Sequence, residues 1–172
     1  MYPRLLVIIL MFDRSLASAL APMLLGLSAL SFLMAGAWYW FGTERWRDNP
    51  PLGLPANPLG LGTSATFAVL FVVVSIASSW AMRQFGTVGI YALAAVVGVS
   101  DINPFVLNLA QHGAGNMSGN VGVIAVLVAT ASNNVFKAVY APAYSSGRIG
   151  FAPTVVLTLL AACGIGMAVA LA

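Results

Sequence analysis

Long apolar stretches separated by short polar segments run through the whole chain. Four of them are long enough to cross a lipid bilayer as helices, because a spanning helix needs about 20 apolar residues. These four stretches are residues 22–41, 61–82, 121–141 and 151–171. Two shorter apolar stretches, 5–12 and 88–99, lead up to Asp13 and Asp101. We interpret the short stretches as ends of discontinuous or tilted membrane spans.

Composition supports a membrane protein rather than a soluble domain. Hydrophobic residues make up 60% of the 172 residues and charged residues only 6%, whereas about a quarter of a soluble domain is charged. The length leaves room for about six spans. We therefore expect an all-α integral membrane protein, with residues 1–172 forming one polytopic domain of about six transmembrane helices.

Charge and cysteine content exclude several function classes. The net charge of +3 comes from scattered side chains without a basic run, so a nucleic acid partner is not expected. Cys163 is the only cysteine, which excludes an internal disulfide. The sequence contains no nucleophile with a matching base, no zinc-ligand spacing and no phosphate-binding glycine loop. We expect neither an enzyme nor a bound cofactor, and an intramembrane enzyme ranks third among the functions considered.

The first 19 residues allow two interpretations. A basic start, the apolar residues 5–12 and Ala17-Ser18-Ala19 would fit a cleaved secretory signal. Asp13 and Arg14 interrupt that pattern, and a long apolar run follows at once, so we favour the end of a membrane segment. The chain could also begin partway into a longer protein.

A polar, proline-rich segment at 43–60 is expected to lie outside the membrane, because it cannot continue a helix. Beside it are four aromatic residues of the kind that gathers at lipid headgroups, and we expect them to form an interfacial belt. They are Trp38, Tyr39, Trp40 and Trp46.

The sequence around Asp13 resembles that around Asp101 in its hydrophobic pattern, at an offset of 88 residues. At the same offset, residues 62–66 correspond to 150–154, and each segment opens a long span. We therefore consider two repeats, 1–84 and 85–172, each with three membrane passes. An odd number of passes would invert one repeat relative to the other, as in many secondary transporters. Asp13-Arg14 fits either a surface turn, which we favour, or the counterpart of Asp101.

Asp101 is the first polar residue that needs an explanation, because a charge in mid-membrane costs about 2.5 to 3.5 kcal/mol. Pro104 suits the first position of a new helix and Asn103 suits its cap, so we predict a broken helix near Asp101. Free backbone groups at such a break can bind ions. Asp101 is the best candidate for a metal ligand, although the metal is unknown.

Two polar stripes follow from helical spacing. Asn108 and then Gln111 or His112 lie on the face that Asp101 begins. We read His112 as interfacial, with a proton relay or a metal ligand as the alternative. In the span 121–141, Thr130, Ser132, Asn133, Asn134 and Lys137 interrupt an apolar helix. Lys137 either snorkels toward water or pairs with Asp101 or Asp13, and the two asparagines could also simply hold helices together.

These motifs resemble a known family. Its pattern is found in Asn57-Pro-Leu at the start of a span, in Val88-Gly-Ile-Tyr-Ala-Leu-Ala-Ala-Val-Val-Gly-Val-Ser-Asp101, in Leu109-Ala-Gln, and in Ala131-Ser132-Asn133-Asn134-Val-Phe-Lys137-Ala. The chain resembles the membrane domain of unknown function that follows the MgtC/SapB domain in bacterial proteins. The resemblance implies a bacterial inner-membrane protein, with Asp101, Ser132, Asn133 and Lys137 as its polar signature. An MgtC/SapB part is lacking, so that part is either lost or the chain is a fragment.

The expected function is transport of an inorganic ion, with a divalent cation such as magnesium as one candidate, or of a small polar solute. The alternative is a non-transporting membrane subunit that packs in or regulates a larger membrane complex. A homodimer or a larger complex is expected, in contact with the lipid bilayer. The residues expected to line an ion or solute path are Asp101, Asn103, Asn108, Gln111, Ser132, Asn133, Asn134 and Lys137.

Overall fold

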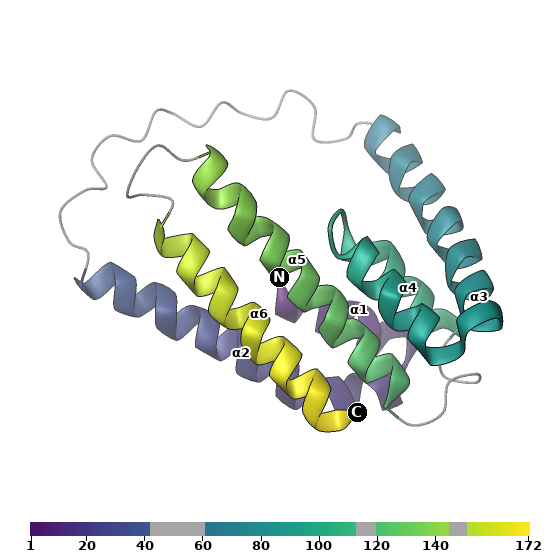
Figure 1. The fold of residues 1–172 in the computed structure, drawn as a ribbon, viewed down its shortest axis with the longest axis horizontal. Coiled ribbons are helices and arrows are strands. Elements are labelled where there is room, and N and C mark those ends of the chain that lie inside the picture. The colour runs from purple at the N-terminus through teal and green to yellow at the C-terminus, as the bar shows by residue number, and fades with distance from the viewer. Residues whose placement is uncertain (42–60, 113–119, 145–150) are drawn as a thin grey trace.

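The computed structural model describes residues 1–41, 61–112, 120–144 and 151–172, and these residues form an all-helical fold (Figure 1). The helices are α1 (Tyr2–Phe12), α2 (Arg14–Phe41), α3 (Leu61–Val97), α4 (Ile102–His112), α5 (Val121–Tyr144) and α6 (Phe151–Leu171).

Four of these helices are long and apolar enough to cross a membrane, and they include the four apolar stretches predicted to do so. They are α2, α3, α5 and α6. The other two, α1 and α4, have 11 residues each. A helix of that length extends about 16 Å, roughly half the thickness of the hydrocarbon layer.

α5 is the central helix of the fold. In the most apolar stretch of 18 residues of α5, 67% of the residues are buried, whereas the corresponding share in α2, α3 and α6 is 17% to 28%. α6 packs along it on one side, and the end of α3 and α4 pack on the other (Figure 1). The buried core around α5 includes Phe105 of α4 and Leu5 and Ile9 of α1. Polar groups on α5 are thus held in the interior of the bundle.

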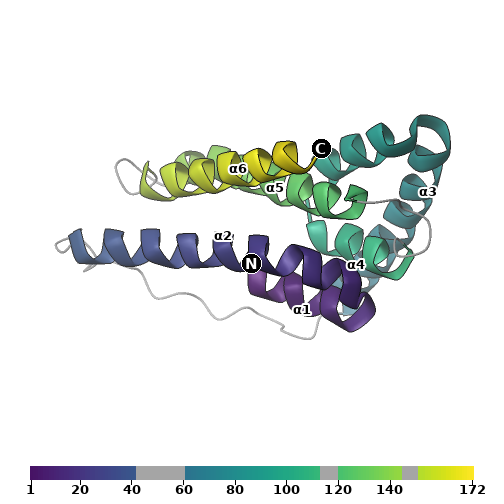
Figure 2. The ribbon, with the colours of Figure 1, turned by 90° about the horizontal axis from the view of Figure 1, so that it is seen from below.

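α3 bends sharply at Gly86, where the backbone adopts φ 59° and ψ −139°. This conformation has a positive φ, which glycine adopts without the steric penalty that a Cβ atom brings. Gly86 therefore divides α3 into two helical parts, which correspond to the predicted span 61–82 and the predicted short stretch 88–99. The part before Gly86 diverges from the bundle, and the part after it returns toward α5 (Figures 1 and 2).

Two tight connections, each at an aspartate, bring helices back on themselves. Asp13 separates α1 from α2, and α1 packs along the first half of α2 (Figure 2). The residues 98–101 separate α3 from α4, which also pack together. α1 and α4 lie against each other, so the two connected pairs share one interior.

Large apolar side chains cover the outer faces of the helices, which fits contact with lipid. The exposed ones include Leu25, Phe32 and Leu33 on α2, Val72, Val73 and Ile76 on α3, and Leu159, Ile165 and Val169 on α6. Together with the four spanning helices, this surface indicates an integral membrane protein.

Several sequence predictions concern residues outside those described. The loop 43–60 with Trp46 lies there, as do the side chains of Tyr39 and His112. The side chains at 62–66, which supported the repeat, also lie outside the described residues. Trp38 and Trp40 are described, and both are exposed near the end of α2.

Candidate functional site

Four of the polar residues singled out in the sequence lie where α3 ends and α4 begins, beside the middle of α5: Asp101, Asn103, Ser132 and Asn133. α3 ends at Val97 and α4 begins at Ile102, so the break predicted near Asp101 is present. Asp101 Oδ1 accepts hydrogen bonds from the Asn103 backbone N–H at 3.0 Å and from Asn103 Nδ2. Among the described residues the second carboxylate oxygen, Oδ2, has no partner.

Asp101, and not Asn103, caps α4, which corrects the prediction that the helix starts at Pro104. A carboxylate is an effective cap because it accepts the amide groups that have no partner in the first turn. Pro104 becomes the third residue of α4, where its missing N–H costs nothing since first-turn amides lack helical partners. Asn103 instead lies inside the first turn and is partly buried.

Ser132 and Asn133 of α5 bind the last carbonyl groups of α3. Ser132 Oγ donates to Ala95 O at 2.6 Å, and Asn133 Nδ2 donates to Gly98 O at 2.9 Å. The last four carbonyl groups of a helix have no partner within it. The two side chains therefore tie the end of α3 to the centre of α5.

Gly98 allows this close contact between α3 and α5. A Cβ atom at Gly98 would lie 2.6 Å from both Ala129 O and Ser132 Cβ, and 2.9 Å from Ser132 Oγ. Two of these atoms are close to the helix backbone and cannot move aside easily. Glycine is thus the residue that fits at the start of the break.

Asn133 keeps one polar atom without a partner. Its side chain is 5% exposed, and its Oδ1 is a buried acceptor with no hydrogen bond among the described residues. A buried polar group left unsatisfied costs about 1 to 3 kcal/mol. Asn133 is the thirteenth of the 24 residues of α5, so this atom lies halfway along a spanning helix.

Asn134 and Lys137 face α1 and not the break. Asn134 Nδ2 donates to the Tyr2 hydroxyl at 2.8 Å, and both side chains are buried. Lys137 is exposed, and its Nζ lies 3.4 Å from Met1 Sδ. Among the described residues no ion pair joins Lys137 to Asp101 or Asp13, so the pairing alternative is not observed.

The first turn of α1 also reaches the break. Arg4 donates from its guanidinium group to Asn103 Oδ1 at 3.1 Å. α1 thereby contacts Asn134 of α5 through Tyr2, and Asn103 of α4 through Arg4. The sequence pattern did not indicate Tyr2, Arg4 or Gly98 as site residues, and of the three only Gly98 lies in a recognisable motif, the one that ends at Asp101.

The remaining predicted residues are spread over different environments. Asn108 is buried on α4, whereas Gln111 near the end of α4 is exposed. The polar stripe predicted to follow Asp101 is therefore buried at one residue and exposed at the other. Thr130 is buried and donates to Leu127 O of its own helix at 2.9 Å. The described part of the chain contains no group of three histidine, cysteine, aspartate or glutamate side chains suited to a metal ion.

Asp13 performs the same local task as Asp101. Its Oδ1 accepts hydrogen bonds from the backbone N–H groups of Ser15 at 2.9 Å and Leu16 at 3.0 Å, and so caps α2. Arg14 beside it is exposed. This shared capping role is what a counterpart of Asp101 would show, although the repeat as a whole stays a prediction.

Comparison with known proteins supplies the family. An uncharacterized protein of Aquifex aeolicus (strain VF5) is 30% identical over 128 residues, which is 74% of this chain and 55% of that protein. The chain thus spans about half the length of the curated relative it matches. No solved structure matches the chain. The model of a family described as a domain of unknown function, DUF4010, matches residues 1–145, and the chain therefore belongs to the DUF4010 family.

Proposed function

We propose that this protein is a transporter or channel-like protein that moves an inorganic ion or a small polar solute across a membrane. The observation that carries the proposal is the buried Oδ1 of Asn133, which lies without a partner beside a broken helix. Transporters bind their substrates and coupling ions at such breaks, near the middle of the bilayer. The helices that surround this break are apolar on their outer faces.

The proposed path follows the break between α3 and α4 and the polar face of α5. Asp101 supplies a negative charge, and the amides replace part of the water around the solute. Asn108, Gln111 and Lys137 extend the path away from the break. The neutral residues of the proposed path are Asn103, Asn108, Gln111, Ser132, Asn133 and Asn134.

The family resemblance adds a substrate candidate and a location. It supports a divalent cation such as magnesium as one candidate, and the bacterial inner membrane as the location. Two copies of the chain, or a larger complex, would form the working unit.

Ion flux into liposomes tests the proposal, with Asp101→Asn as the informative variant. Asparagine caps a helix about as well as aspartate does, so this change removes the charge and keeps the α4 cap. Asp13→Asn is the matched control, because it makes the same change at the cap of α2. Transport predicts a large loss of flux for Asp101→Asn only. Equal flux in both variants, or no flux of any tested ion in the wild type, contradicts it.

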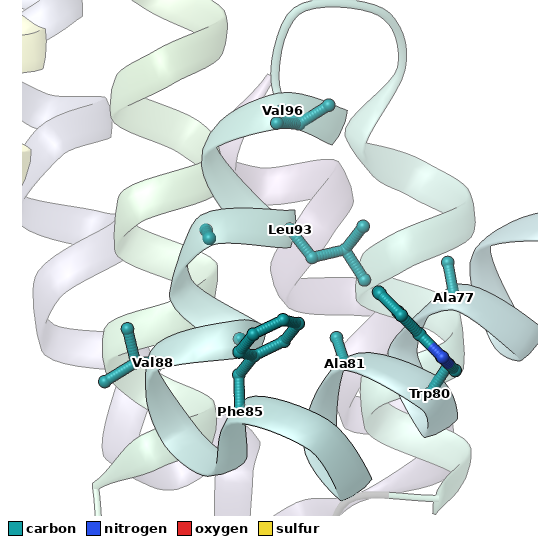
Figure 3. A pocket seen from close by; sticks show the side chains of 9 residues that line it. Ala77, Trp80, Ala81, Phe85, Val88, Leu93 and Val96 are labelled. Atoms are coloured by element: carbon teal, nitrogen blue, oxygen red, sulfur yellow. The ribbon is translucent and has the colours of Figure 1, made fainter.

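A second candidate function is a non-transporting subunit that packs against a partner in the membrane. The observation in its favour is the apolar inner corner of α3, where side chains from both sides of Gly86 surround a pocket of about 400 Å³ (Figure 3). Trp80 and Phe85 meet there edge to face, with ring centroids 5.7 Å apart. This function predicts copurification of a membrane partner and no effect of Asp101→Asn on permeability.

A further inference from the structure

The orientation of the Asn133 amide is fixed by its surroundings. Gly98 O needs a hydrogen-bond donor, and of the two polar atoms of the amide only Nδ2 can donate. The close packing of Gly98 against Ala129 and Ser132 holds the two helices at this spacing. Asn133 Oδ1 therefore stays an acceptor, and its natural ligand is a cation or a hydrogen-bond donor.

The backbone groups around Asn133 are also acceptors. Gly98 O and Ala95 O each hold one hydrogen bond from α5, and a carbonyl oxygen has a second lone pair for another ligand. Ala95 O lies in the last turn of α3 and Gly98 O directly follows its last residue, at the end that carries the negative partial charge of the helix dipole. Asp101, three residues after Gly98, adds a full negative charge. The local field favours a cation over a neutral donor.

The ligand atoms indicate the class of cation. Amide and backbone carbonyl oxygens are neutral, and in broken helices such groups coordinate Na⁺. Magnesium requires a regular octahedron and is usually held through one or two carboxylates together with several waters. The residues that the structure describes contain no cluster of three acidic or histidine side chains. A monovalent cation fits this set of oxygens better than a divalent one.

We propose that Asn133 Oδ1, together with the carbonyl groups at the C-terminal end of α3, binds a monovalent cation of the Na⁺ type, with Asp101 balancing its charge. This inference rests on the proposed function and deepens it, because it names the ion that occupies the break. The site belongs to a single chain, since all of these atoms come from α3, α5 and the residues between α3 and α4.

Thermal unfolding of the purified protein in detergent tests the site. The midpoint is measured in NaCl, KCl, choline chloride and MgCl2 at constant ionic strength, and Na⁺ binding is confirmed by equilibrium dialysis with labelled Na⁺. A ligand that binds only the folded state raises the midpoint as its concentration rises. We expect Na⁺ to raise it relative to choline, and Asn133→Ala to weaken binding by about tenfold or more, as the loss of a direct ligand does.

Thr130→Ala is the matched control. It removes a buried polar side chain three residues earlier on α5, whose hydroxyl donates to Leu127 O of its own helix and which is not part of the proposed path. Its midpoint should be lower than that of the wild type but should still rise with Na⁺. Asn133→Asp is the second variant: it loses the donor to Gly98 O, so its midpoint in choline chloride should fall, but it keeps an acceptor oxygen and adds a negative charge, so Na⁺ should raise its midpoint more than it raises that of the wild type.

Three results would overturn the inference: no response of the wild type to Na⁺ or K⁺, a response to Mg²⁺ that exceeds both, or an unchanged Na⁺ response in Asn133→Ala. Failure of the site and failure of transport can be told apart. Na⁺ binding without ion flux in liposomes would retain the site and remove the transport function. Flux that depends on Asp101 but not on Na⁺ or Asn133 would retain transport and remove the site.

Discussion

Asn134 and Tyr2 are joined by a 2.8 Å hydrogen bond, although they are 132 positions apart in the sequence. Both side chains are buried, with 3% and 4% of their surfaces exposed. The bond fastens the first turn of α1 to the middle of α5. α1 is only 11 residues long, so this contact contributes a large share of its polar anchoring.

Tyr2→Phe should therefore destabilise the protein by about 1 kcal/mol, because Asn134 Nδ2 is left buried without an acceptor. Unfolding in detergent, followed by circular dichroism, measures the change. Tyr91→Phe is the control, since the hydroxyl of Tyr91 has no hydrogen bond among the described residues. A double-mutant cycle with Asn134→Ala should recover the coupling between the two positions. Independent effects would show that this bond does not contribute to stability.

Gly98→Ala should be among the most damaging small changes in the chain. The added methyl group would meet Ala129 O and Ser132 Cβ at 2.6 Å, and overpacking of this kind costs about 1 to 3 kcal/mol. Gly166→Ala on α6 is the control, because no atom lies within 4 Å of its added Cβ. Unfolding midpoints of the two variants provide the comparison. Equal midpoints would mean that α3 and α5 can move apart at Gly98 without a loss of stability.

The sequence was informative wherever local pattern decides the structure. Span length follows from bilayer thickness, and for that reason the four long helices were predictable. The break at Asp101 was predictable because an aspartate followed by Asn103 and Pro104 is costly inside a continuous apolar helix. The choice of cap was not, since Asp101 and Asn103 are both good caps and only their geometry in the fold distinguishes them.

Partners across the fold could not be predicted from one sequence. Asn133 and Asn134 are adjacent and identical, yet one faces α3 and the other faces α1. Their directions depend on how the helices pack, and helical spacing alone does not give that. Tyr2 and Arg4 were missed for the same reason. Their positions near the start of the chain give no sign that α5 and Asn103 lie beside them.

The two aspartate caps should respond alike to substitution. Asp101→Ala and Asp13→Ala each remove a side chain that accepts first-turn amides, which costs about 0.5 to 2 kcal/mol. Asp101→Asn and Asp13→Asn should stay close to wild type in stability. Chemical unfolding of the four variants checks this. A large destabilisation by Asp101→Asn alone would mean that its charge, and not its capping, holds α4 in place.

Cys163 offers a direct test of how the bundle lies in the membrane. It is the only cysteine of the chain, and its side chain is exposed on α6, where it is the thirteenth of 21 residues. If this face of α6 contacts lipid, a membrane-impermeant maleimide cannot reach the thiol from water, and labelling should be slow. A cysteine at the exposed position 111, introduced as Gln111→Cys in a Cys163→Ala background, should react about tenfold faster or more.

Both proteins should react equally after unfolding in sodium dodecyl sulfate, which controls for the amount of reagent and protein. Labelling is followed by the mass added to the intact chain in proteoliposomes. Fast labelling of Cys163 in intact membranes would place the outer face of α6 in water. The four spanning helices could not then form the lipid-facing wall that their exposed side chains indicate. Slow labelling at Cys163 with fast labelling at position 111 instead fits a short α4 that returns from the break to the membrane surface.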